Sequence, residues 1–185
     1  IEAIGDVAPL GICGSGMISA LAEMFITGVI DKRGKFDVAL VKEHQPERPR
    51  ARKGEHGNEF VLVWAEASGT GEDIVLTEVD LDNLIRAKAA IYAGVTSMTN
   101  NLGIPVAAIE EVLIGGAFGQ HVNVEQGIQI GLLPDLPWDR FKFLGNTSAW
   151  GAYMALLSLH ARMKAEEIAG QLTYLELIAD NTFYN

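Results

Sequence analysis

Three glycine-bearing corners, each lying between an extended segment and a helix, are the parts of this sequence best suited to chemistry. They occupy residues 11–16, 115–119 and 145–146. Glycine lets the backbone approach a ligand closely and adopt positive φ. A helix start presents unpaired N–H groups and a positive dipole end, which together favour phosphate. Structural need explains a single corner, but three in one domain favour nucleotide binding.

None of the corners fits a standard nucleotide-binding fingerprint. No Gly-Lys-Ser/Thr sequence follows the glycines, so a P-loop is excluded. Gly14-Ser15-Gly16 opens a predicted helix, but it lacks the third glycine of the dinucleotide motif. The acidic residue expected about 20 positions later is also missing, because Asp31 is too near and lies in a turn.

The elements that must position the corners alternate between strand and helix. Helices are predicted from apolar spacing over 17–30 with Ser15 as N-cap, 81–102 with Asp80 as N-cap, 123–130 with Asn123 as N-cap, 147–159 with Asn146 as N-cap, and 161–172. Strands are predicted over 60–64, 74–76, 111–114, which we expect to be buried, 141–144 and 174–177. This alternation is typical of an α/β domain.

Composition excludes several classes of protein. The 185 residues include 24 acidic and 14 basic side chains, for a net charge of −10, which argues against nucleic-acid binding. No run approaches the ~18 apolar residues of a membrane span. Cys13 is the only cysteine, which excludes an internal disulfide or a cysteine-only cluster site. We interpret it as a small buried residue, with a low-pKa thiol at a helix N-terminus as the alternative. We expect a reducing, cytoplasmic location. The start at Ile1 suggests a piece of a longer polypeptide.

Residues 42–58 are polar and read as an exposed loop, followed by two short strands. Together with their flanks they predict a small β-rich insertion at about 31–80. Arg48, Arg50, Arg52 and Lys53 are expected to form a solvated face or to dock an acidic partner. The four histidines have no metal-ligand spacing, so we predict no metal site.

The run Ile114-Gly115-Gly116-Ala117-Phe118-Gly119 resembles the adenosine motif of the superfamily of acetate kinases, sugar kinases, heat-shock chaperones and actin. In that superfamily, a strand ends in a Gly-Gly pair whose backbone lies against the adenosine. Residues 146–152 resemble its second connecting helix, and Gly14-Ser15-Gly16 resembles the helix start that lines the cleft. The resemblance implies a ribonuclease-H-like α/β fold with a mixed central sheet flanked by helices.

The sequence also resembles the C-terminal part of reductive activators of corrinoid proteins, in residues 11–16, 87–91, 115–119, 130–134 and 145–146. This resemblance implies that residues 1–185 form the second half of an ATPase that uses ATP with Mg²⁺. The parent chain would carry an N-terminal [2Fe–2S] domain whose electron returns a partner corrinoid protein from Co(II) to Co(I). The superfamily's two Asp-x-Gly phosphate loops are absent here, so no catalytic residue can be assigned. The oligomeric state stays open, a homodimer included.

The resemblance also implies roles for individual residues. The loop around the adenosine would comprise Gly115, Gly116, Ala117, Phe118 and Gly119, with Phe118 either packing beneath the turn or flanking the adenine. The phosphate end would be lined by Gly14, Ser15 and Gly16. Lys88 either snorkels from its helix or contacts ribose or phosphate, Asn146 either caps its helix or contacts the nucleotide, and Gly151 would permit a close helix crossing.

Two other functions are compatible with the residues present. One is a small-molecule kinase of the same superfamily, whose Asp general base would lie outside this sequence. The other is a non-catalytic binding or dimerisation domain that keeps the fold without the activity. Titration with ATP separates these hypotheses, because the last of them predicts no binding.

Overall fold

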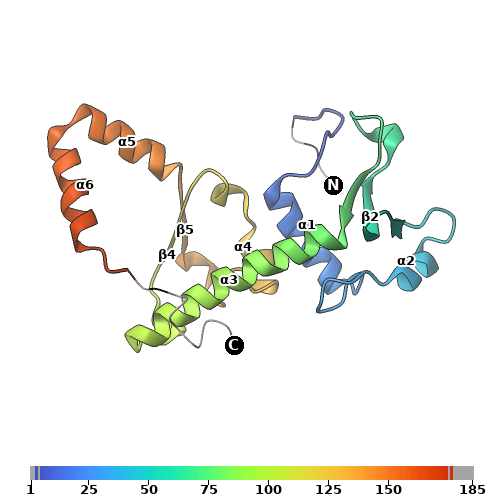
Figure 1. Ribbon diagram of the computed structural model, residues 1–185, viewed down its shortest axis with the longest axis horizontal. Coiled ribbons are helices and arrows are strands. Elements are labelled where there is room, and N and C mark those ends of the chain that lie inside the picture. The colour runs from blue at the N-terminus through green and yellow to red at the C-terminus, as the bar shows by residue number, and fades with distance from the viewer. Residues whose placement is uncertain (1–2, 4, 175, 177–185) are drawn as a thin grey trace.

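The computed structural model describes residues 3, 5–174 and 176, so the strand predicted over 174–177 lies largely outside the described residues. Helix α3 (Glu78–Leu102) runs between two groups of elements (Figure 1). One group holds α1 (Gly14–Ile26), α2 (Val38–His44) and a small antiparallel sheet, and the other holds a parallel strand pair, α5 (Thr147–Leu157) and α6 (Leu159–Gln171). This combination confirms a mixed α/β chain.

The antiparallel sheet has the order β1 (Ala51–Gly54), β2 (Gly57–Val63), β3 (Ile74–Thr77). Gly54 and Gly57 face each other across a two-residue hairpin turn, and Gly57 has a φ of +113°. The sequence predicted β2 and β3, but the interpretation of 42–58 as loop was wrong, because α2 and β1 fall within or overlap that stretch. Neither α2 nor β1 was predicted, because the segment is rich in polar residues and lacks a clear apolar pattern.

Arginine side chains explain how so polar a segment forms a strand. The Arg48 guanidinium lies 3.8 Å from the centre of the Trp64 ring and forms an ion pair with Glu66. That hydrogen bond lowers the pKa of Glu66 to about 2. Arg52 binds Glu59 and Asp73, each at 2.8 Å. Arg48 and Arg52 thus pair with acidic neighbours, but their side chains stay 55% and 42% exposed and Lys53 is exposed too, so a solvated face or an acidic docking site stays a prediction.

The hydrophobic core lies between α1, the sheet and the start of α3. It is formed by Ile18, Leu21, Ala22, Met24, Ile30, Phe36, Leu62, Leu76, Leu81, Ile130 and Leu132. Burying each large side chain contributes about 1.5–3 kcal/mol. The last two residues follow α4 (Val124–Gln129), which Asn123 caps through Gln126 N–H, as predicted. The core therefore fixes α4 against α1.

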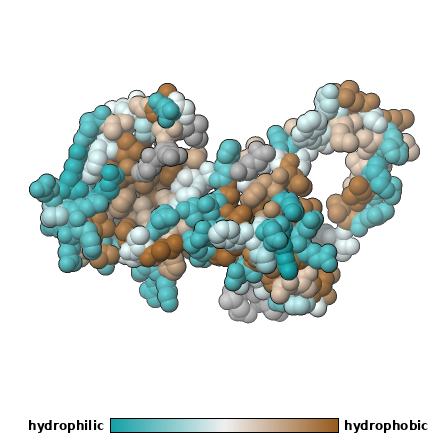
Figure 2. All heavy atoms as spheres, turned by 180° about the vertical axis from the view of Figure 1, so that it is seen from behind, coloured by the Kyte–Doolittle hydropathy of each residue, from teal (hydrophilic) through white to brown (hydrophobic). Residues whose placement is uncertain are grey.

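The parallel pair β4 (Val112–Gly115) and β5 (Phe141–Gly145) is much more open. Leu113 is 59% exposed, so the prediction of a buried strand is wrong for this structure. Parallel strands are usually covered on both faces, whereas in the described part of the chain β4 and β5 pair only with each other. No residue of α5 or α6 is buried in the described structure. Figure 2 shows apolar side chains along the part of the molecule formed by α5 and α6.

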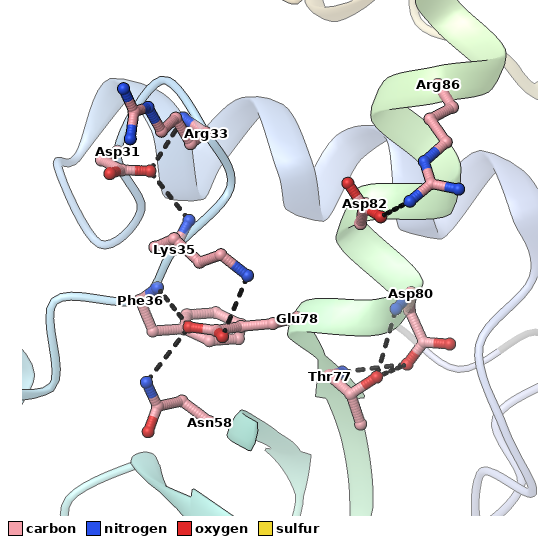
Figure 3. Close-up of polar contacts among 10 residues, drawn as sticks. All are labelled: Asp31, Arg33, Lys35, Phe36, Asn58, Thr77, Glu78, Asp80, Asp82 and Arg86. Atoms are coloured by element: carbon pink, nitrogen blue, oxygen red, sulfur yellow. Dashed lines mark hydrogen bonds and ion pairs between the residues drawn. The ribbon is translucent and has the colours of Figure 1, made fainter. Parts of the chain in front are cut away.

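The start of α3 is a dense polar junction (Figure 3). Thr77, rather than the predicted Asp80, is the N-cap, and Asp80 completes a capping box with it. The Glu78 carboxylate accepts hydrogen bonds from Lys35 Nζ, Phe36 N–H and Asn58 Nδ2 at 3.1–3.2 Å. One side chain thereby joins the turn after α1, strand β2 and helix α3.

Glu78→Gln should make the protein less stable at pH 7 and flatten its acid sensitivity. Burial raises the pKa of Glu78, but the bonds from Asn58, Phe36 and Lys35 outweigh it, so the net pKa is lowered. A carboxyl with a lowered folded pKa stabilises the protein above its unfolded pKa, and this is lost as pH falls through the folded pKa. We expect a cost of about 1–2 kcal/mol at pH 7 that shrinks below about pH 4. Thermal unfolding of the wild type and the variant from pH 7 to 3 measures this difference in stability. A difference that stays constant across that pH range would contradict the prediction.

Candidate functional site

Two of the three glycine corners meet at the carboxyl ends of β4 and β5. The strands are parallel, so both chains leave the pair at the same edge, where open α/β sheets bind ligands. The Gly116 N–H donates to the Gly145 carbonyl at 2.6 Å. A Cβ placed on Gly115 would lie only 2.6 Å from Oγ1 of Thr147, the first residue of α5. The second and third corners therefore form one continuous backbone surface.

The first corner reaches the same place from the other side. A Cβ on Gly14, the first residue of α1, would lie 2.6 Å from Cε2 of Phe118. Phe118 itself is 54% exposed, so its ring is not a core anchor but lies on the surface against α1. The start of α1 is thereby brought against the glycine loop after β4, although about 100 residues separate them in sequence.

Both helix starts at this site are capped by side chains. Asn146 Oδ1 accepts from Ala149 N–H at 3.1 Å, which confirms it as the cap of α5. At α1 the cap is Cys13, whose Sγ accepts from Gly16 N–H at 3.4 Å, rather than the predicted Ser15. The first amides of each helix have no intrahelical acceptor. They remain suited to an anion.

Cys13 is exposed, which corrects the interpretation of a small buried residue. Its pKa is lowered by the hydrogen bond with Ser15 Oγ, 3.3 Å away, and by the Gly16 N–H. The Ser15 hydroxyl therefore favours the thiolate form of Cys13 at the start of α1. The lowered pKa agrees with the alternative of a thiol at a helix N-terminus, whereas the capping role was not predicted, because cysteine is not among the usual N-cap residues.

Two of the predicted site residues are not exposed at the glycine corners. Gly119 is buried, and a Cβ there would lie 2.6 Å from Cγ2 of Ile114, so close packing accounts for this glycine. Lys88 lines a cavity between α1, α3 and the end of α4, and none of the glycine-corner residues lines that cavity. Gly14, Gly115, Ala117 and Asn146 are exposed, and Ser15, Gly16 and Gly116 are partly exposed.

A hollow of ≈ 870 Å³ borders the first corner. It is enclosed by residues before α1, by one side of α1 and by β2 and β3, and Cys13 and Gly16 stand at its edge. Figure 2 shows apolar side chains gathered in this half of the molecule. Sequence reasoning missed both this hollow and the Thr147 contact, because each depends on residues distant in sequence.

Within the described residues, no three His, Cys, Asp or Glu side chains gather in a way that could hold a metal ion. A search of the same part of the chain for a helix both long and apolar enough to cross a bilayer finds none.

Comparisons with known proteins give a consistent result. A family model described as the C-terminal domain of RACo, the ASKHA domain, matches residues 1–185. The corrinoid activation enzyme RamQ of Eubacterium limosum is 36% identical over 181 residues, covering 97% of this chain and 30% of RamQ. A solved structure of a reductive activator for corrinoid, iron-sulfur protein has a TM-score of 0.91 and 48% identity, covering 99% of this chain and 28% of its own. The chain thus spans less than a third of either relative.

Proposed function

The chain belongs to the family of C-terminal ASKHA domains of RACo, and on that premise we propose that it forms the adenosine side of an ATP site in a reductive activator of a corrinoid protein. Gly115 and Gly116 would lie against the adenosine, with Ala117 and Phe118 beside them. Gly14 and Ser15 would line the phosphate end through helix amides, with Gly16, whose N–H donates to Cys13 Sγ, beside them. Asn146 keeps its role as a cap and places the first amides of α5 at the same edge.

The observation that carries this proposal is the convergence of the three corners. Gly14 touches Phe118, Gly115 touches Thr147, and the Gly116 amide binds the Gly145 carbonyl. These contacts leave little room for a Cβ atom at Gly14 or Gly115, and Gly116 has a φ of +104°, so the three glycines keep a backbone surface that a flat purine can approach. Glycines that served only to turn the chain would have no reason to come together at one edge of the β4–β5 pair.

The residues present suit a nucleotide and do not suit an iron–sulfur cluster. Cluster ligation requires several thiolates, and Cys13 is the only cysteine. We therefore place the [2Fe–2S] cluster, the Mg²⁺ ligands and the residues that handle the γ-phosphate in other parts of a longer protein. There the cluster would supply the electron that takes Co(II) to Co(I), and nucleotide binding would change how the activator engages its partner.

The open surface of β4, β5, α5 and α6 supports a domain completed by other parts of the polypeptide. On α5, Trp150 is 64% exposed and Leu156 75% exposed, and Tyr153, Met154 and Leu157 are exposed beside them, so the exposed apolar side chains form a run rather than single cases. We infer that the remaining strands of a ribonuclease-H-like sheet pair with β4 or β5, and that α5 packs on the other half. A cytoplasmic location is part of the same proposal.

The experiment is a titration of the full-length protein with MgATP, followed by an assay of corrinoid reduction. We expect micromolar ATP binding, and ATP-dependent formation of the Co(I) absorption spectrum in a corrinoid protein supplied with a reductant for the cluster. Absence of ATP binding would favour a non-catalytic domain. ATP binding with phosphate transfer to an added sugar or acetate, and no corrinoid reduction, would favour a kinase.

A further inference from the structure

A second cavity, of ≈ 400 Å³, lies where α1, α3 and the turn after α4 approach one another. Its apolar wall includes Leu21, Phe25, Ile30, Ile85, Ile128 and Ile130. Its polar groups come from Asp31, Lys32, Lys88 and Gln129. A volume of a few hundred Å³, mostly apolar walls and a few convergent polar groups are typical of a small-molecule site.

The side chains at this cavity carry two positive charges, on Lys32 and Lys88, and one negative charge, on Asp31. In the part of the chain that the structure describes, neither Lys32 nor Lys88 forms an ion pair or a hydrogen bond through its ammonium group. Acidic side chains outnumber basic ones by 24 to 14, so partners were available in the sequence. Two ammonium groups left unpaired beside one hollow suggest that an anion is their partner.

Asp31, the carboxylate at the cavity, is engaged by its own turn. Its Oδ1 accepts the N–H groups of Arg33 and Lys35 at 2.8 and 2.9 Å (Figure 3). These bonds hold the carboxylate on the backbone of residues 31–35, and no ion pair joins it to either lysine in the described structure. Asp31 therefore leaves the cavity with a net positive charge, and it is bonded to its own turn rather than to a lysine.

Lys88 is the better placed of the two lysines. It is partly buried on α3, and its Nζ lies 3.6 Å from where a Cβ of Gly131 would stand. Its methylene stem can lie along the apolar wall while the ammonium faces the turn after α4. The Lys88 ammonium could also be explained by its attraction to the negative C-terminal end of the α4 dipole. However, α4 is only six residues long, and such an attraction would not require the cavity beside it.

We propose that this cavity binds a small organic anion, in which a carboxylate or phosphate group is carried on an apolar ring or short chain. Lys88, assisted by Lys32, holds the charged group, and the side chains of α1 and α3 hold the apolar body. The site is separate from the glycine corners, since none of their residues lines it. It goes beyond the proposed ATP site and does not depend on it.

The test uses 1-naphthyl phosphate and its neutral analogue 1-naphthol, titrated into the full-length protein by calorimetry. We expect the phosphate to bind at least tenfold more tightly than the naphthol. Lys88→Met, which keeps the apolar stem, should weaken the phosphate at least tenfold and leave the naphthol unchanged. Lys32→Met should have a smaller effect. Lys42→Met, on α2 and outside the cavity, is the matched control and should have none.

The same samples are titrated with MgATP. Naphthyl phosphate that binds equally well with ATP saturating supports a separate site. Competition with ATP, loss of ATP affinity in Lys88→Met, equal binding of phosphate and naphthol, or no binding of the phosphate would each overturn the proposal. Failure of ATP to bind would instead refute the proposed nucleotide site, and the naphthyl phosphate result would still decide this one.

Discussion

Gly115→Ala should lower the affinity of the full-length protein for MgATP by tenfold or more. The new methyl group would lie 2.6 Å from Thr147 Oγ1, well inside van der Waals contact, so the Thr147 side chain must rotate or the start of α5 must move away from the end of β4. Overpacking of this kind costs about 1–3 kcal/mol, and about 1.4 kcal/mol corresponds to tenfold in affinity. Isothermal calorimetry with wild-type and variant protein measures the change.

A second substitution makes this result specific. Thr147→Ala removes the Oγ1 atom, and the nearest remaining atom of residue 147 would then be its Cβ, 3.7 Å away, which is ordinary contact. We expect Thr147→Ala alone to bind ATP nearly as well as wild type, and the double variant Gly115→Ala/Thr147→Ala to recover most of the lost affinity. Unchanged binding by Gly115→Ala would remove the glycine corners from the nucleotide site. A double variant as weak as the single would show that the steric explanation is wrong.

Leu81→Ala should be the most destabilising simple core substitution on α3. The Leu81 side chain is fully buried, at 0% exposure, in the core shared by α1, the antiparallel sheet and the first turns of α3. Leu→Ala changes at such sites cost about 2–5 kcal/mol, because the lost contacts add to a cavity that relaxes only in part. Urea unfolding followed by circular dichroism measures the loss.

Val79→Ala, two residues earlier in the same turn, is the matched control. Val79 is 51% exposed, and alanine has the higher helix propensity, so we expect a change within about 0.5 kcal/mol. Hydrogen exchange should also accelerate in β2 and β3 of Leu81→Ala, since the same core supports them. Equal losses in the two variants would show that this core does not hold α3 to the sheet.

The parts of the fold that sequence reasoning predicted well are those determined locally. Asn123 and Asn146 were identified as caps because an Asn before an apolar helix satisfies its amides within three residues. Strands β2 and β3 were found from their apolar and β-branched composition. By contrast, β1 was missed because its stability comes from Trp64, Glu59 and Asp73, which lie outside it.

The candidate site shows the same limit. The glycine corners are visible in the sequence, but their meeting depends on the Gly14–Phe118 and Gly115–Thr147 contacts, which no local pattern encodes. Lys88 was singled out as a snorkelling or nucleotide-contacting lysine, but the cavity that it lines is formed by residues of α1 and of the α4 region as well, which no local pattern shows. The exposure of Leu113 was not predicted, because an apolar strand looks the same whether or not other strands cover it.

Helix α3 joins the Glu78 junction to the segment that leads into β4. At 1.5 Å per residue its 25 residues form a rod about 37 Å long. A tilt of only ~5° about the Glu78 end would sweep the far end through about 3 Å, by the same helix geometry. The position of the segment that leads into β4 is therefore more sensitive to the orientation of α3 at the Glu78 junction than residues near that junction are.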